Sequence, residues 1–204
     1  MIDNPQRIFG TTELDPHYLS TPFGVQTNWH VITGAACSGK TTLIDQLTDK
    51  GFRTIAETAR QCFEKELARG RTLDEIHENE AALQRCIDDM QLGVEQGLRA
   101  VEVAFLDRGL PDSITFRRIF GMDPNEILQE CFHHRYASVF ILDRLPVQRS
   151  TPLGPEDEVA AGFLDEWLAR DYSFLGYGVV RVPVLSPKER LAFVLERLAE
   201  LDLI

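Results

Sequence analysis

Residues 34–41, GAACSGKT, match the pattern G-x-x-x-x-G-K-[ST] at every fixed position. Glycines allow a tight turn in which successive backbone N–H groups point toward one anion. The helix expected after this turn adds unpaired N–H donors and a partial positive charge. In such a turn the Lys40 ammonium would contact the β- and γ-phosphates of a nucleotide, and the Thr41 hydroxyl would be a ligand for Mg²⁺.

This segment therefore predicts a site for a nucleoside triphosphate, with ATP and Mg²⁺ as the expected cofactors. A strand is expected just before the motif, over 29–33, and a helix just after it, which is the context that the motif requires. Thr42 is expected at the α-phosphate. The predicted nucleotide-binding residues are Gly34, Ala35, Ala36, Cys37, Ser38, Gly39, Lys40, Thr41 and Thr42.

Acidic residues follow three further predicted strands: Glu57, Asp107 and Asp143. In open α/β sheets, ligands bind outside the carboxyl ends of the strands, so all three are candidates for the site. Asp107 could hold Mg²⁺, directly or through water, or could take a proton from an acceptor hydroxyl. Thr41 and Asp107 are the predicted metal ligands.

Arginines accompany these acids. Glu57 and Arg60 are three residues apart and share one helix face, and Arg108 follows Asp107 directly. Phosphoryl transfer requires positive charge close to the equatorial oxygens of the transferred phosphoryl group. A loop that closes over the site can bring this charge. The predicted catalytic residues are Lys40, Asp107, Glu57 and Arg108, and the predicted substrate-binding residues are Glu57, Arg60, Arg108, Arg144 and Arg149.

Strand and helix patterns alternate along the chain, which predicts an α/β sandwich with a mostly parallel sheet. Apolar residues recur at three- and four-residue steps from Leu73 to Arg99 and predict one long helix, with Thr72 and Glu75 as a capping box. Residues 1–24 are predicted to be an N-terminal extension, and residues 25–204 one nucleotide-binding domain. Strands are expected over 29–33, 52–56, 101–106, 137–142 and 179–184, and helices over 40–50, 57–69, 73–99, 112–120, 124–134, 156–172 and from Pro187.

Composition narrows the function classes. The formal net charge of −11 argues against a general nucleic-acid binder, which needs a basic surface. The chain has no apolar run long enough to span a membrane and no apolar leader, so we expect a cytoplasmic protein. The four cysteines lack zinc or redox spacing, so we expect reduced thiols, no disulfide and no structural metal.

Several segments together resemble a family of small AAA-type P-loop ATPases with kinase-like folds. Its relatives are ribosylnicotinamide kinase domains and nucleoside and nucleotide kinases. The resemblance covers about residues 28–202. The segments that carry it are GAACSGKTT, ETAR (57–60), LDRGLPD (106–112), YSFLGYGVVRVP (172–183) and the pair Glu189-Arg190.

The resemblance implies a P-loop NTPase three-layer sandwich with a five-stranded sheet and a small helical lid over about residues 144–165. It also implies Mg²⁺–ATP at residues 34–42 and a small-molecule acceptor near Glu57, Arg60, Asp107 and Arg108. By analogy with related nucleoside kinases, Glu57 would be the base and Asp107 the acid on the metal side. The residues by themselves also allow the reverse assignment.

Three hypotheses about function follow. The first is a kinase that transfers the γ-phosphoryl group of ATP to a small acceptor. The second is a nucleotide-dependent regulatory ATPase or GTPase switch without a small-molecule acceptor. The third is an interaction module with a vestigial phosphate site, against which the intact Lys40 and Thr41 argue.

Overall fold

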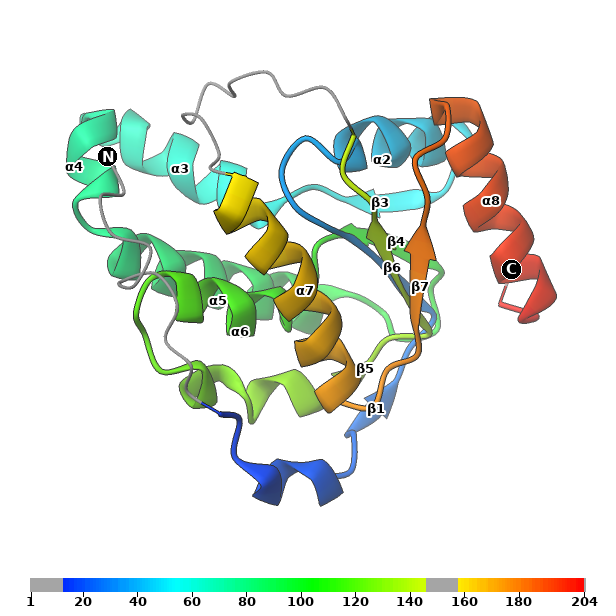
Figure 1. Cartoon of the computed structure of the whole chain (residues 1–204), viewed down its shortest axis with the longest axis horizontal. Helices are drawn as coiled ribbons and strands as arrows, with labels where there is room; N and C mark the ends of the chain where they lie inside the picture. The colour runs from blue at the N-terminus through cyan, green and yellow to red at the C-terminus, as the bar shows by residue number, and fades with distance from the viewer. Residues whose placement is uncertain (1–12, 146–157, 204) are drawn as a thin grey trace.

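The computed structural model describes residues 13–145 and 158–203, with side chains from 162 onward in the second segment. A five-stranded sheet forms its centre, in the order β3-β4-β2-β6-β7, with every neighbouring pair parallel (Figure 1). The predicted five-stranded parallel sheet is thus confirmed. The strands are β2 (Trp29–Thr33), β3 (Arg53–Ile55), β4 (Ala104–Asp107), β6 (Ser138–Leu142) and β7 (Val179–Val182).

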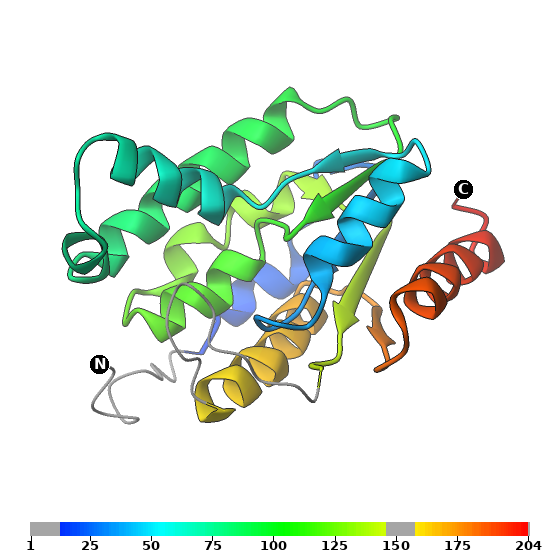
Figure 2. The same cartoon turned by 90° about the horizontal axis from the view of Figure 1, so that it is seen from above.

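Helices cover both faces of this sheet. α2 (Lys40–Asp49) and α8 (Pro187–Glu200) pack on one face through a cluster that includes Leu47, Leu198 and the strand residue Phe140. α6 (Asp112–Ile119) and α7 (Glu158–Phe174) pack on the other, through residues such as Ile114, Leu168 and Val31. Figure 2 shows α7 and α8 on opposite sides of the sheet. Because neighbouring strand residues point to opposite faces, β2, β4, β6 and β7 each contribute to both clusters, which confirms the three-layer sandwich.

The single helix predicted over 73–99 is wrong. The chain forms α4 (Leu73–His77) and α5 (Glu80–Gly97) instead, and Asn79 between them accepts a hydrogen bond from the backbone N–H of Ala82 at 3.2 Å. The predicted capping box is present, since the Thr72 N–H donates to Glu75 and the Glu75 N–H to Thr72. Asparagine is a strong N-cap residue, so a new helix begins after Asn79. The apolar periodicity continues through this position, which is why the sequence pattern predicts a single helix.

α5 also buries a different face from the one expected. Its apolar residues are half-buried, whereas four polar residues spaced along one side are buried. A third helix, α3 (Thr58–Ala68), packs against α5. The buried polar row faces the polar parts of α6 and the loop before it. Its members are Gln84, Asp88, Gln91 and Glu95.

The helix predicted over 124–134 is also wrong. This segment forms the 3₁₀ turns η2 (Pro124–Ile127) and η3 (Glu130–Phe132), followed by β5 (His134–Arg135). β5 pairs in parallel with β1 (Val25–Gln26). The backbone N–H and C=O groups of β5 therefore form hydrogen bonds between strands and are not available to continue a helix.

The described part of the N-terminal segment packs onto this ladder region. A 3₁₀ turn, η1 (Pro16–Ser20), carries Tyr18, whose ring stacks on Phe132 with centroids 6.1 Å apart. Phe23 contacts the same ring at 5.0 Å. Among the described helices, none is long and apolar enough to cross a membrane.

Candidate functional site

The glycine-rich loop, residues 34–39, joins the end of β2 to the start of α2. Its turn depends on backbone angles that favour glycine, with φ of 140° at Gly34 and 87° at Gly39. A Cβ atom on Gly34 would lie 2.7 Å from the carbonyl oxygen of Leu142 in β6, so no side chain fits there. The loop therefore connects strand to helix in the context that the sequence motif requires.

Lys40 reaches back across the loop from the first turn of α2. Its Nζ donates to the carbonyl oxygens of Gly34 at 3.0 Å and Ala35 at 2.8 Å. Burial, reinforced by the charge of Arg108, lowers the pKa of Lys40 to about 8. Thr41 and Thr42, which follow on the same turn, are exposed. A compact cation and two accessible hydroxyls thus lie together at a helix N-terminus, an arrangement suited to binding an anion.

Asp107 ends β4, in register with Ile32 of β2, and so lies beside the loop. Its residue is 6% exposed, and its Oδ1 has no hydrogen-bond partner within the described part of the chain. Burial raises the pKa of Asp107 to about 6, against the opposing charge of Arg108. A buried carboxylate oxygen without a partner is unfavourable, and Mg²⁺ or a water on it would satisfy that oxygen. The residues present therefore fit a metal ion here.

Arg108 links three parts of the site. Its Nε donates to Glu57 Oε1 at 2.8 Å, and its Nη1 donates to Asp112 Oδ1 at 3.1 Å and to the Gly34 carbonyl oxygen at 3.2 Å. Its backbone adopts φ of 72°, an uncommon value for a residue with a side chain. Burial acts to raise the pKa of Glu57, but the charge and hydrogen bond of Arg108 outweigh it and hold that pKa below its ordinary value.

Asp112 lies at the start of α6, within the LDRGLPD segment, and the sequence pattern assigns it no role. Its Oδ1 also accepts from the Thr33 hydroxyl, and its Oδ2 accepts from the Tyr172 hydroxyl at 2.6 Å and the Gly109 N–H at 3.2 Å. Both oxygens are thus engaged. Asp112 fixes Arg108 rather than presenting a free carboxylate.

The buried polar row of α5 holds the loop that follows β4. Gln91 accepts from the Thr58 hydroxyl at 3.0 Å, and its Nε2 lies 3.4 Å from the Arg108 carbonyl oxygen. Glu95 Oε1 accepts from the Leu110 N–H at 3.1 Å and from the Tyr136 hydroxyl at 2.8 Å. Apolar residues at these two positions would remove the side-chain partners of the Arg108 carbonyl and of the Leu110 N–H, so the polar row supports the loop that carries Arg108.

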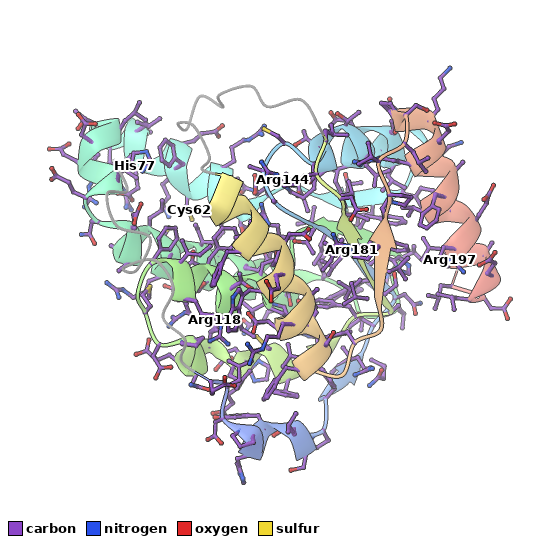
Figure 3. The ribbon with its side chains drawn as sticks, in the orientation of Figure 1. Cys62, His77, Arg118, Arg144, Arg181 and Arg197 are labelled. Carbon is purple, nitrogen blue, oxygen red and sulfur yellow. The ribbon has the colours of Figure 1, made fainter. Side chains whose placement is uncertain are left out.

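The remaining candidates are placed less centrally. Arg60 is exposed on the first turn of α3, where its charge contributes to lowering the pKa of Glu57. Arg144 is half-buried just beyond β6 and is labelled in Figure 3. Asp143 pairs with Arg181 of β7 at 2.5 Å. Residues 146–157 of the predicted lid, which include Arg149, lie outside the described residues.

Arg190 of α8 is a second connector that sequence reasoning missed. It is 4% exposed, and its guanidinium donates to the carbonyl oxygens of Pro183 at 3.0 Å, Asp143 at 2.9 Å and Ser38. One side chain therefore joins the glycine-rich loop to the ends of β6 and β7. Its planar fork of donors suits three backbone acceptors in different directions.

A cavity of about 70 Å³ opens beside the loop, next to Arg190. Gln46 of α2 lines it, and the Oε1 of Gln46 is buried without a hydrogen-bond partner in the described residues. The cavity thus combines apolar walls with one unsatisfied amide oxygen. Its lining residues are Gly39, Thr42, Leu43, Gln46, Leu145, Leu185, Pro187 and Arg190.

Comparison with protein families gives one match, to a family described as an AAA domain, over residues 29–190. The chain belongs to this AAA-domain family. No curated protein sequence matches it.

Solved structures similar to this AAA-domain protein include small kinases. The NadR protein in complex with NR gives a TM-score of 0.63 at 18% identity, covering 85% of this chain and 50% of the other, so the chain spans about half of that protein. Deoxyadenosine kinase from M. mycoides with dCMP and dCDP gives 0.61 at 15% identity, covering 85% and 99%. Shikimate kinase from Aquifex aeolicus gives 0.51 at 15% identity, covering 84% and 96%. The AAA-domain protein therefore has the fold of small P-loop kinases.

Replacing Arg190 by lysine should weaken the junction between the loop and the two strand ends. Lysine keeps the charge but cannot present the same fork, so we expect R190K to lower the free energy of unfolding by about 2–3 kcal/mol. The matched control is R197K on the same helix, where Arg197 is exposed and should change it by less than about 0.5 kcal/mol. Urea unfolding measures both. Equal effects would show that Arg190 is not a connector.

Asp107→Asn should stabilise the protein above pH 6. The raised pKa means that the folded state keeps this proton from about pH 4 to about pH 6 while the unfolded chain releases it, so the wild type loses stability as pH rises through this window. We expect the stability difference between D107N and wild type to grow across the window and then level off at about 1–3 kcal/mol. The control for the lost charge is D89N, at an exposed position on α5. A difference independent of pH would contradict the shift.

Proposed function

We propose that this AAA-domain protein is a kinase that transfers the γ-phosphoryl group of Mg²⁺–ATP to a small-molecule acceptor. The observation that carries the proposal is the unsatisfied buried carboxylate of Asp107 beside the loop that holds Lys40. A cation bound there would satisfy this oxygen, and a triphosphate would bring that cation.

The donor side is formed by the glycine-rich loop and the start of α2. The loop N–H groups and Lys40 bind the β- and γ-phosphates, and Thr42 contacts the α-phosphate. Thr41 and Asp107 hold Mg²⁺, which neutralises charge on the phosphate oxygens. Lys40 is already held by two loop carbonyls, so its ammonium is positioned before nucleotide arrives.

The nucleotide base is placed in the cavity next to Arg190. Leu145, Leu185 and Pro187 supply apolar surface for a ring, and the unpartnered Gln46 oxygen accepts a hydrogen bond from an exocyclic amine. The cavity borders Gly39 and Thr42, so a base there is continuous with phosphates on the loop. Adenine and guanine both carry such an amine, so the cavity fits a purine nucleotide as the donor.

The acceptor side is formed by Glu57, Arg60 and Arg108. Glu57 Oε1 is held by Arg108, while no hydrogen bond to Oε2 is found within the described residues, and the side chain is 25% exposed. Because its pKa is held low, Glu57 is ionised and orients an acceptor hydroxyl by accepting its hydrogen bond. Arg108 stabilises the charge that develops on the transferred group. We therefore assign Asp107 to the metal and Glu57 to the acceptor.

The kinase fold supports this class of reaction over the other hypotheses. The similar structures act, by their names, on deoxyadenosine and on shikimate, which are unlike each other as acceptors. The fold is thus compatible with many acceptors, and the acceptor of this chain is set by its own residues around Glu57.

Lys40→Ala should abolish ATP binding while leaving the chain folded. The variant removes the cation that contacts the β- and γ-phosphates, so we expect affinity for Mg²⁺–ATP to fall by at least about 100-fold. Calorimetric titration measures it. Lys50→Ala, an exposed lysine at the other end of α2, is the matched control. Unchanged affinity in K40A would contradict the placement of the triphosphate.

The reaction itself is tested with γ-labelled ATP and a panel of nucleosides, sugars and vitamins. We expect one class of acceptor to become labelled, and E57Q to lower kcat by about 100-fold while ATP affinity changes little, because Gln cannot carry the carboxylate charge. E64Q, at an exposed position of the same helix, is the control.

Tight ATP binding with no labelled acceptor would exclude the kinase. Slow hydrolysis that changes strongly with a protein partner, without a phosphorylated small product, would instead favour the regulatory switch.

A further inference from the structure

Two cysteine thiols meet where α3 packs against α5. Cys62 projects from α3 (Figure 3) and Cys86 from α5, and their sulfur atoms lie 2.9 Å apart, with the Cys86 thiol donating. Cys62 is fully buried and also lies 3.9 Å from the sulfur of Met90, whereas Cys86 is half-buried. Sulfur atoms in ordinary contact are farther apart, so this pair is closely apposed.

The pair needs little movement to become bonded. A disulfide places its sulfur atoms about 2.05 Å apart, so the two sulfurs must close by less than about 1 Å. Both thiols are free in the structure. The difference in exposure gives them different chemistry, because an oxidant in solution reaches Cys86 before it reaches the fully buried Cys62.

We propose that Cys62 and Cys86 are a redox-active pair that closes to a disulfide on reaction with a peroxide. The Cys86 thiolate attacks one peroxide oxygen, the O–O bond breaks, and Cys86 becomes a sulfenic acid while hydroxide leaves and takes up a proton as water. The Cys62 sulfur then attacks the Cys86 sulfur, its proton passes to the departing hydroxyl, and a second water leaves. Two thiols and one hydrogen peroxide thus give one disulfide and two waters.

The surroundings of Cys62 agree with this order. Burial, together with the hydrogen bond and charge of Cys86, raises the pKa of the Cys62 thiol to about 12, so Cys62 remains protonated. A protonated, inaccessible thiol is a poor first nucleophile toward a solute but is well placed to resolve a neighbouring sulfenic acid.

The pair lies in the two helices that carry and support Glu57 and Arg108. α3 begins directly after Glu57, and α5 contributes Gln91, which accepts from Thr58 and contacts the Arg108 carbonyl. A covalent bond between Cys62 and Cys86 therefore fixes α3 on α5 one turn beyond these contacts. This site does not depend on the proposed kinase reaction.

Peptide mapping tests the proposal directly, because trypsin places each cysteine on a separate peptide. Cys62 lies on 61–65, Cys86 on 86–99, Cys37 on 8–40 and Cys131 on 119–135. The native protein is treated with hydrogen peroxide, its free thiols are alkylated, and it is digested. We expect the linked peptide 61–65/86–99 to exceed any other pair by at least about tenfold, and dithiothreitol to restore both thiols.

Two controls distinguish proximity from general reactivity. Protein unfolded in guanidinium and oxidised in the same way should show no such excess, and C37S should leave the yield of the link unchanged. Absence of the link in native protein, an equal yield after unfolding, or conversion of Cys86 to sulfinic acid instead would overturn the proposal.

The order of the two steps is tested separately with dimedone, which traps sulfenic acids. In C62S, dimedone should label Cys86, because the resolving thiol is missing. In C86S, Cys62 should remain unlabelled. Labelling of Cys62 in C86S but not of Cys86 in C62S would overturn the assigned order.

Discussion

The balance of charges around Arg108 determines which ions the site can bind. Two cations, Lys40 and Arg108, lie among three carboxylates, those of Glu57, Asp107 and Asp112, and all five interact electrostatically. Arg108 is bonded to Glu57 and Asp112, while Lys40 is bonded to loop carbonyls. With every carboxylate ionised, the cluster carries one uncompensated negative charge, at Asp107. Buried charges are tolerated when paired, so either a proton or a cation belongs there. Burial is the main cause of the raised pKa of Asp107, and the carboxylates of Glu57 and Asp112 add to it against the charges of Arg108 and Lys40.

Holding Arg108 in this place requires support from distant elements. Its positive φ is unfavourable by itself, and the loop after β4 keeps it through hydrogen bonds to Gln91, Glu95 and Tyr136. This explains why α5 buries a polar row where its periodicity predicts an apolar stripe. Arg190 of α8 also connects separate parts of the site, because its hydrogen bonds join the glycine-rich loop to the ends of two strands. The site is therefore held by two guanidinium groups, that of Arg108 at the end of β4 and the buried one of Arg190 from α8.

The sequence was sufficient where the signal is local. The phosphate-binding motif lies within consecutive residues, 34–41, and the acids that end strands are found by locating five short apolar runs. The side-chain contacts of the site could not be predicted, because they join residues far apart in the sequence. Arg108 binds Glu57, 51 positions away, and Arg190 binds Ser38, 152 positions away. The helix predicted over 124–134 failed for the same reason, since its end pairs with a strand more than a hundred residues earlier. The break at Asn79, by contrast, had a local signal in a strong N-cap residue.

The same contacts limit where an acceptor can approach under the proposed reaction. Arg108 is fixed on one side by Asp112 and lies with its guanidinium 5.0 Å from the ring centre of Phe116, so its position is set before any acceptor binds. Glu57 is bound through one oxygen and is exposed through a quarter of its side chain, and the exposed Arg60 is close enough for its charge to lower the pKa of Glu57. Under the proposed reaction, an acceptor at Glu57 would therefore lie near Arg60. Arg60 is exposed and forms no ion pair with a carboxylate in the described part of the chain. Under the proposed reaction its charge would be available to an anionic group on the acceptor, which favours acceptors that carry one.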